Sequence, residues 1–176
     1  MTHKPVTLET GRLILRPHGL DDFAAMVKLW SAPQVTQFIS GARAQTEEEV
    51  WQRLLRYRGL WPLLGFGYFV LTEKTSGSFV GEAGLADFHR DIEPTLKGQA
   101  EAGWALMPDH WGKGLATEAL TAILAWYQTQ QNARPVCCIM DPDNEPSNRL
   151  AEKAGFRLQC VTEYKGFACN LYRLKG

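Results

Sequence analysis

The sequence predicts an α/β (or α+β) fold built around one mixed sheet. At 176 residues the chain has the length of one compact domain, long enough to bury a core without disulfides or metal ions. Short apolar runs typical of strands are interspersed with stretches whose apolar residues recur at helical spacing. One long helical stretch joins two strand-like runs, which makes those two strands parallel neighbours. We therefore expect a single domain, residues 1–176, without internal repeats or linkers.

Capping residues and helix breakers set the expected helix boundaries. Thr46 and Glu49 have capping-box spacing, so a helix is expected to begin there and to stop by Gly59 or Pro62. Gly155 stands where a left-handed C-terminal cap belongs. The expected helices run from about Asp22 to Pro33, from about Glu47 to Gly59 or Pro62, from Leu115 to about Gln131, and from Ser147 to Ala154. The seven expected strands are 13–16, 68–72, 79–85, 101–106, 136–140, 156–162 and 171–174.

The composition excludes several classes of protein. Lys and Arg balance Asp and Glu at 19 each, so no overall field attracts nucleic acid or an anionic membrane. No apolar stretch approaches the roughly 20 residues that span a bilayer. Residues 1–5 lack the apolar core of a secretory signal, and we expect a cytoplasmic protein. The four cysteines lack the C-x-x-C spacing of zinc or redox sites, so no metal is expected, although a catalytic thiol at Cys137 or Cys138 stays open.

Residues 101–119 have the pattern of a strand, a glycine-bearing turn and the start of a helix. Gly112 and Gly114 let the backbone approach a ligand closely, and the first turn of a helix offers unpaired N–H groups and partial positive charge. A pyrophosphate fits such a site, although the two glycines also suit a plain tight turn. Thr117 excludes the dinucleotide fingerprint, and the G-K-[ST] of a nucleotide-triphosphate loop is absent.

Three segments, in order along the chain, resemble motifs of the GNAT acetyltransferases, particularly their RimJ/RimL-like ribosomal-protein branch. The run W-G-K-G-L-A-T-E-A at 111–119, after E-A-G-W-A-L-M-P, is similar to that family's acetyl-CoA signature. The run E-T-G-R-L-I-L-R-P at 9–17 is similar to its opening motif E-T-x-R-L-x-L-R-P. The run at 144–156 is similar to its N-x-x-S-x-R-x-x-E-K-x-G-F. One departure is Asp109, where the wider superfamily often has Gln or Arg.

The resemblance implies where acetyl-CoA binds. In this family the fourth and fifth strands of a mixed, mostly antiparallel sheet splay apart, and the pantetheine arm lies between them like an extra strand. Backbone groups near Leu106 and Met107 would bond the arm, and the side chain of Asn144 would reach it. The pyrophosphate would take amides of the turn and helix start. The resulting cofactor set is Leu106, Met107, Gly112, Lys113, Gly114, Leu115, Ala116, Thr117, Asn144 and Ser147.

Acetyl transfer to nitrogen needs a neutral amine, an oxyanion donor and an acid for the leaving thiolate. Glu101, at the start of the strand that leads to the cofactor, is one candidate base, and a solvated surface residue is its plainer interpretation. Glu163 resembles the stretch that supplies a proposed base in the ribosomal-protein enzymes. Ser147 resembles the serine placed beside the thiolate as acid, and it also suits a helix N-cap. His89 and His110 are left out of the catalytic set.

Three functions remain open from the sequence. The first is an N-acetyltransferase that moves the acetyl group of acetyl-CoA to a protein N-terminus or a small amine. The second is an inactive module that binds CoA or acetyl-CoA. The third is an antibiotic-modifying acetyltransferase, whose cationic substrates would favour a cleft lined with carboxylates such as Glu47, Glu48 and Glu49. The resemblance also suggests a homodimer. Of six aromatic residues in the region of the expected acceptor pocket, some would face substrate: Trp30, Trp51, Tyr57, Trp61, Phe66 and Tyr68.

Overall fold

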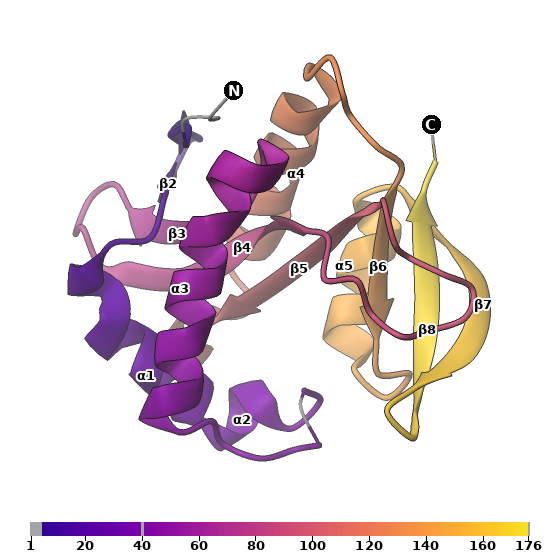
Figure 1. Cartoon of the computed structure of the whole chain (residues 1–176). Coiled ribbons are helices and arrows are strands. Elements are labelled where there is room, and N and C mark those ends of the chain that lie inside the picture. Colours follow the sequence, from indigo (N-terminus) through magenta and orange to yellow (C-terminus); the bar gives the residue numbers. More distant parts are fainter. Residues whose placement is uncertain (1–4, 40, 176) are drawn as a thin grey trace.

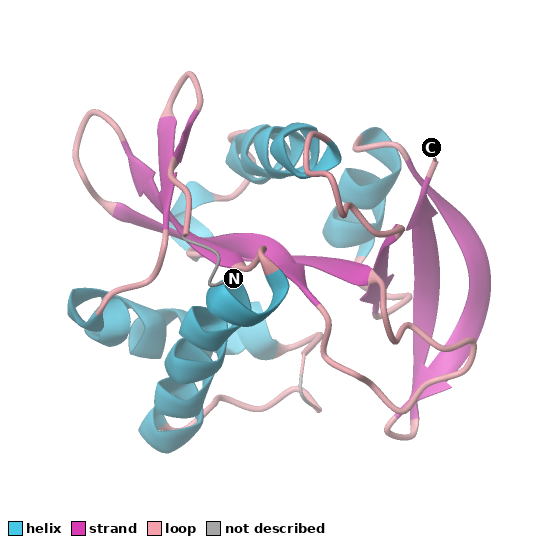
Figure 2. Ribbon diagram, turned by 45° about the horizontal axis from the view of Figure 1, so that its top comes forward, coloured by secondary structure: helices cyan, strands magenta, loops and turns pink. Residues whose placement is uncertain are grey.

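The computed structural model describes residues 5–39 and 41–175 and shows one sheet with helices on both faces (Figures 1 and 2). The helices are α1 (Phe23–Ser31), α2 (Pro33–Thr36), α3 (Glu47–Leu64), α4 (Leu115–Gln128) and α5 (Glu145–Lys153), with short 3-10 turns at Leu20–Asp22 and Pro108–His110. The strands are β1 (Leu8–Glu9), β2 (Leu13–Arg16), β3 (Tyr68–Glu73), β4 (Phe79–Ala86), β5 (Ala100–Leu106), β6 (Val136–Met140), β7 (Phe156–Tyr164) and β8 (Phe167–Leu174).

The strand order is β1-β2-β3-β4-β5-β6-β8-β7, so the sheet has eight strands, not the seven expected. The additional strand is β1, which is only two residues long and pairs Leu8 with Leu15 and Glu9 with Ile14. Every pair of neighbours is antiparallel except β5 and β6, which are parallel and joined through α4. The mixed α/β sheet expected from the long helical connection is therefore confirmed.

Two apolar cores lie on opposite faces of this sheet. Phe69 and Leu71 of β3 point to the face covered by α4. Tyr68 of β3 and Ala105 of β5 point to the other face, against α1 and α3. This alternation follows from the two-residue period of a strand, and it decides which side chains face the substrate cavity described below.

The expected end of α3 was wrong. The capping box at Thr46 and Glu49 is present, but the helix passes Pro62 and ends only at Gly65, whose φ of 80° is left-handed. A proline forfeits one backbone hydrogen bond. Burial of Leu60 and Trp61, 8% and 0% exposed, outweighs that loss and carries the helix on to Leu64.

Two other boundaries differ from expectation. Helix α5 begins at Glu145, because the side chain of Asn144 accepts a hydrogen bond from the Ser147 backbone N–H at 3.3 Å. Asn144 is therefore the N-cap, and the interpretation of Ser147 as the cap was wrong. Strands β7 and β8 are longer than expected and meet in a tight turn at Lys165 and Gly166, both with positive φ. The sequence did not predict this turn, because a lysine seldom adopts positive φ.

Candidate functional site

The parallel strands β5 and β6 are paired at one end only. Ala100 pairs with Val136 and Glu101 with Cys137, and no ladder joins the two strands beyond these residues. In Figure 1 they start close together and run apart toward their carboxyl ends. A wedge-shaped gap therefore opens in the middle of the sheet, which is the splay expected of the central strands.

One edge of β5 faces this gap with unpaired backbone groups. The Met107 N–H donates to the Val80 carbonyl at 2.9 Å, on the β4 side, and the Ala100 N–H donates to Pro135 at 3.0 Å, on the β6 side. Because alternate residues of a strand direct their backbone groups to opposite sides, Trp104 and Leu106 face the gap. The Leu106 carbonyl accepts from the Trp111 indole at 2.8 Å. The remaining groups form a polar strip that an extended, amide-bearing ligand can pair with.

The turn after β5 leads into a helix start without a side-chain cap. Gly112 and Gly114 have φ of 69° and 75°, a left-handed conformation that favours glycine. Gly114 is the N-cap residue of α4, and as a glycine it has no side chain that could accept from the first backbone amides of the helix. The amides of Leu115, Ala116 and Thr117 therefore stay available. A Cβ built on Gly112 would meet no atom within 4 Å. The arrangement suits a bound phosphate group.

Two of the sequence motifs are in contact behind this turn. Glu118 of α4 accepts hydrogen bonds from the Thr10 hydroxyl at 2.5 Å, the Arg12 backbone N–H at 2.8 Å and the Arg12 guanidinium at 2.7 Å. Arg12 also donates to the Lys113 carbonyl at 2.8 Å. Burial would raise the pKa of Glu118, but these hydrogen bonds and the Arg12 charge outweigh it and hold that pKa below its usual value. This cluster, called here the Glu118 clamp, fixes the turn from its outer side.

Helix α5 closes the other side of the gap. Asn144 and Ser147 lie at its start, directly after β6. The Ser147 hydroxyl oxygen accepts a hydrogen bond from the Trp104 indole N–H at 3.2 Å, which bridges β5 and α5. Within the described part of the chain this hydroxyl donates to no acceptor, so its proton can be given to a ligand. Asn144 and Ser147 both line the cavity that begins in the gap.

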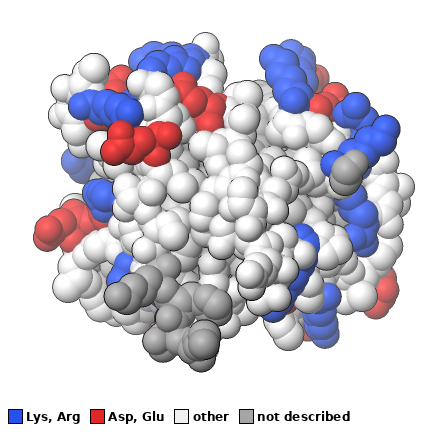
Figure 3. All heavy atoms as spheres, turned by 90° about the horizontal axis from the view of Figure 1, so that it is seen from above, with Lys and Arg blue, Asp and Glu red and all other residues white. Residues whose placement is uncertain are grey.

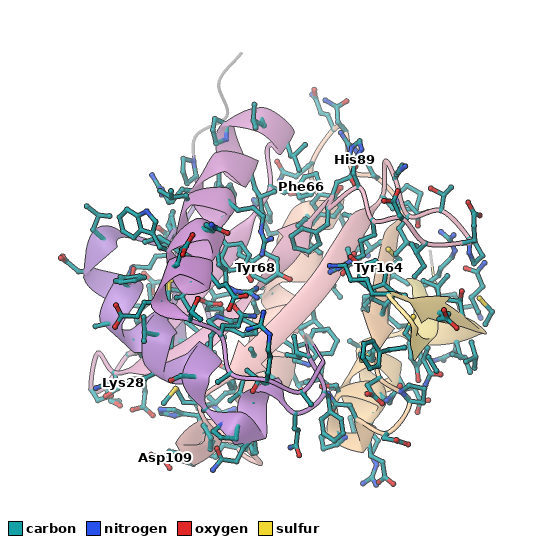
Figure 4. All side chains as sticks on the ribbon, turned by 60° about the horizontal axis from the view of Figure 1, so that its bottom comes forward. Lys28, Phe66, Tyr68, His89, Asp109 and Tyr164 are labelled. Carbon is teal, nitrogen blue, oxygen red and sulfur yellow. The ribbon has the colours of Figure 1, made fainter. Side chains whose placement is uncertain are left out.

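The cavity has a volume of about 950 Å³ and runs from the gap to the inner face of α3. Its walls in the gap are residues 101–105 of β5, 138–140 of β6 and Asp141 directly after β6. Beyond the gap it is lined by α3, with Arg53, Tyr57 and Leu60, and by the tip of the β7–β8 hairpin. Figure 4 shows Tyr68 on the α3 side of β5 and Tyr164 on the hairpin side. The cavity is thus an open slot at one end and an aromatic pocket at the other.

Comparison with known proteins assigns this architecture. Residues 12–157 match the model of the Acetyltransferase (GNAT) domain. The chain belongs to the GNAT acetyltransferase family. It is 26% identical to the uncharacterized N-acetyltransferase p20 of Bacillus licheniformis, over 94% of this chain and 93% of that protein.

Solved structures agree with this assignment. A protein of Bordetella pertussis assigned to the GnaT family is 32% identical, with a TM-score of 0.83 over 97% of this chain and 99% of that one. RimL, a ribosomal L7/L12 alpha-N-protein acetyltransferase solved with coenzyme A, has a TM-score of 0.77 over 96% of this chain and 97% of its own. At 18% identity, RimL shows the shared GNAT fold alone.

Of the expected cofactor residues in this GNAT chain, the structure arranges most around the gap. Leu106 turns its backbone N–H toward the gap, whereas both backbone groups of Met107 are engaged, by Val80 and by His110. Lys113 is exposed in the glycine turn. Asp109, the departure from the family pattern, is exposed in the 3-10 turn before it.

Glu101 lies in the cavity wall but is tied to Arg90. It is 6% exposed, and its two carboxylate oxygens accept from the Arg90 guanidinium at 2.7 and 2.8 Å. Burial would lower the pKa of Arg90, yet the hydrogen bonds and charge of Glu101 hold that pKa above its usual value. The Arg90 guanidinium also lies 5.0 Å from the ring of Tyr164. Glu101 is thus a fixed anion beside the gap.

The structure does not bring Glu163 to the same cavity. Glu163 is exposed on the outer side of β7 and lines a separate, smaller hollow with Asp91 and Lys97. Its neighbour Tyr164 points inward and lines the main cavity. The sequence therefore indicated the correct hairpin, but the side chain of Glu163 faces away from the gap.

Glu82 is a site residue that the sequence reasoning missed. It is fully buried in β4, where its carboxylate accepts from the Trp30 indole at 3.0 Å and contacts His18 Nε2 at 3.2 Å. It also lines the cavity. The available signal was one charged residue inside the apolar run 79–86, since a buried carboxylate needs partners.

The six aromatic residues expected near the acceptor pocket divide between the cavity wall, the core and the surface. Trp30, Tyr57 and Tyr68 line the cavity, whereas Trp61 is core and Trp51 is 41% exposed. Phe66 belongs to the core on the α4 face.

Burial raises the pKa of Cys137 to about 12 and that of Cys138 well above its usual value, so both stay inert thiols at neutral pH. His89 is exposed, and the ring Nδ1 of His110 is buried without a partner in the described part of the chain.

The described residues contain no group of three His, Cys, Asp or Glu side chains arranged to hold a metal ion. No helix within residues 5–39 and 41–175 has the length and apolarity needed to cross a membrane. The face in Figure 3 carries both signs of charge around its margin and few charges in its middle.

Proposed function

We propose that this GNAT acetyltransferase is an N-acetyltransferase that uses acetyl-CoA as donor and a primary amine as acceptor. The observation that carries the proposal is the coincidence of two features at one end of the splay. The unpaired edge of β5 offers strand-like hydrogen bonds, and the uncapped start of α4 offers amides to an anion. A pantetheine arm carries amides and ends in a pyrophosphate, which matches both features.

Acetyl-CoA would supply the activated acetyl thioester, and the chain's own residues would hold it. Trp104 and Leu106 would pair with the arm, and Asn144 lines its path. The amides from Gly112 to Thr117 would take the pyrophosphate, with the Lys113 ammonium beside it. The open space at the Cβ position of Gly112 leaves room for that group.

Two cavity residues fit roles in the transfer. Ser147 can pass its hydroxyl proton to the leaving thiolate and regain a proton from the newly acetylated nitrogen, because the Trp104 indole donates to the hydroxyl oxygen and leaves that proton for the thiolate. Both carboxylate oxygens of Glu101 already accept from Arg90, so we assign Glu101 to hydrogen bonding of the incoming amine or of a water beside it. Removal of the amine's proton is helped by the aromatic walls, since desolvation lowers the pKa of an amine. Glu163 has no part in this proposal.

The cavity does not favour a polycationic substrate such as an aminoglycoside. Glu49 is part of the capping box of α3 and is paired with Arg43, and that hydrogen bonding, together with its backbone bond to Thr46, lowers the pKa of Glu49 to about 2. Asp87 is engaged by Arg134. The carboxylate cluster at 47–49 is therefore a capped helix start.

Turnover with an amine panel tests the proposal. The purified protein is incubated with acetyl-CoA and N-terminal peptides, free amino acids, polyamines or aminoglycosides, and both thiol release and acetylated product are followed. Acetylation of an amine that depends on the protein is the expected result. Acetyl-CoA binding without turnover on any amine would instead identify a CoA-binding module, and absence of binding would refute the proposal.

A further inference from the structure

The acceptor end of the cavity contains two guanidinium groups that form no ion pair with a carboxylate of the described residues. Arg53 and Arg56 project from α3 into this end, on the same helical face as Tyr57 and Leu60. Within residues 5–39 and 41–175, the ion pairs involve neither Arg53 nor Arg56. Both arginines therefore line the cavity, and neither positive charge has an ion-pair partner among the described residues.

The partners of Arg53 are neutral groups. Its guanidinium lies 3.7 Å from the ring centroid of Trp30 and donates to the Gln45 side-chain oxygen at 3.2 Å and to the Tyr57 hydroxyl at 2.8 Å. Burial raises the pKa of Tyr57 and of Tyr68, so both phenols stay neutral and supply no negative charge. Arg56 lies over the rings of Phe88 and Tyr57, at 5.2 and 5.8 Å.

Among the described residues five carboxylates line this cavity, and all but Asp141, which follows β6, have side-chain partners other than Arg53 and Arg56. Asp87 is paired with Arg134. Glu101 is paired with Arg90 and Glu49 with Arg43. Glu82 is buried, and although its charge interacts with that of Arg53, its oxygens are taken by His18 and by the Trp30 indole. Arg53 is half-buried and Arg56 is exposed. A partly desolvated guanidinium that lacks an anionic partner is costly, and a bound carboxylate lowers that cost through two parallel hydrogen bonds.

A short path links these arginines to the splayed strand. The Arg53 guanidinium bonds to Tyr57, whose ring stacks on that of Tyr68 at 4.2 Å and 4°. The Tyr68 hydroxyl lies directly over Gly103 of β5, where a Cβ would overlap it. Two stacked rings thus separate Arg53 from the strand with which the pantetheine arm is proposed to pair.

We propose that the acceptor of this enzyme carries a carboxylate close to its reacting amine, and that Arg53 and Arg56 bind this carboxylate. The inference rests on the proposed function, because that function makes this end of the cavity the acceptor site. The carboxylate belongs either to a free amino acid or to an acidic residue beside a peptide N-terminus. Both sources present the same chemistry to the two guanidiniums.

Matched pairs of acceptors test this inference. One arm compares N-terminal peptides that differ only by Asp or Asn at the second position, and the other compares 4-aminobutyrate with its amide. The kcat/KM of the acidic member is expected to exceed that of its neutral twin by tenfold or more in at least one arm. The arm that discriminates identifies the source of the carboxylate, and equal or better use of the neutral twins in both arms would overturn the inference.

Variants of α3 locate the effect. Arg53→Gln and Arg56→Gln are expected to bring the acidic-to-neutral ratio toward one, mainly through KM, and Arg53→Lys to restore part of it by keeping the charge. The matched control is Arg58→Gln, because Arg58 is an exposed arginine of the same helix, like Arg56, but does not line the cavity. A ratio that survives both Gln substitutions would contradict the assignment to these arginines.

Direct binding separates this inference from the proposed function. The acidic and neutral members of both pairs, the peptides and 4-aminobutyrate with its amide, are titrated by calorimetry into the protein saturated with CoA. Tighter binding of an acidic member that is lost in Arg53→Gln, without turnover of any amine, would support the anion site and refute acetyl transfer. Turnover of neutral amines without preferential binding of acidic ones would support transfer and refute the anion site.

Discussion

Ser147 and Trp104 join the two sides of the splay through a single hydrogen bond. The Trp104 indole donates to the Ser147 hydroxyl oxygen at 3.2 Å, so the proton of that hydroxyl is directed elsewhere. Asn144 is the residue that caps α5, which frees Ser147 from a structural role at the helix end. The geometry therefore favours a chemical role for this hydroxyl.

Ser147→Ala is expected to lower kcat by about a hundredfold to ten-thousandfold, because a positioned acid typically contributes on this scale. The measurement is steady-state turnover on the best acceptor of the panel. Trp104→Phe is the comparison variant, since it removes the indole donor and keeps the hydroxyl, and it is expected to cost less. A Ser147→Ala protein with the kcat of the parent would remove Ser147 from the mechanism.

At the scale of elements, the Glu118 clamp ties the start of α4 to the segment before β2. Three hydrogen bonds from Thr10 and Arg12 converge on one carboxylate, and Arg12 holds the Lys113 carbonyl as well. The two motifs that carried the family resemblance at residues 9–17 and 111–119 are thus parts of one structure. The glycine turn needs such support, because glycines leave the backbone free to move.

Glu118→Gln is expected to lower the free energy of unfolding by about 1–3 kcal/mol, since hydrogen bonds to a charged group are lost or weakened. The pKa of Glu118 is lowered in the folded state, so its contribution is complete above the unfolded value of about 4.3 and is lost as pH falls through the folded value. Denaturant unfolding of both proteins should therefore differ most above about pH 5 and converge on acidification.

Glu145→Gln serves as the control for that measurement. Glu145 forms an i,i+4 pair with Arg149 in which both side chains are about 70% exposed, and such pairs contribute about 0.5 kcal/mol or less. An equal loss of stability in both variants, or a difference for Glu118→Gln that does not depend on pH, would contradict the clamp.

Helix α3 offers a second test at this scale. Gly59 lies inside the helix, and a Cβ added there would meet no atom within 4 Å. Gly59→Ala is expected to raise the free energy of unfolding by about 0.5–1 kcal/mol, because alanine has the higher helix propensity. Thermal unfolding measures the change, and a destabilised Gly59→Ala protein would show that α3 is not continuous across this residue.

The elements also show where prediction from sequence succeeds. Strand β6 has the bounds that its apolar run predicted, and the capping box fixed the start of α3, because both signals are local. The end of α3 was missed because burial of Trp61 against other elements overrides a local breaker. The prediction that Glu163 faces the site was wrong because successive side chains of a strand point to opposite faces. A shift of one residue therefore determines whether Glu163 or Tyr164 faces the cavity.

At the scale of the whole molecule, the parts of the site that could be predicted from the sequence are those that do not depend on long-range contacts. The glycine turn, Asn144 and Ser147 could be predicted because each belongs to a continuous motif. The contact between His18 and Glu82 could not, because 64 residues separate them and only the pairing of the sheet brings them together. The unpaired edge of β5 likewise follows from the ladder with β6 ending after Cys137. The cavity is therefore a product of the sheet's topology.

The most direct test of the account is calorimetric titration of acetyl-CoA into the parent protein and two variants, Gly112→Asp and Gly112→Asn. Asp and Asn tolerate positive φ about equally, so the two variants differ chiefly by one negative charge at the proposed pyrophosphate site. We expect binding on the order of micromolar for the parent, a modest loss for Gly112→Asn, and at least tenfold weaker binding again for Gly112→Asp. Failure of the parent to bind acetyl-CoA, or equal affinities for the two variants, would contradict the account.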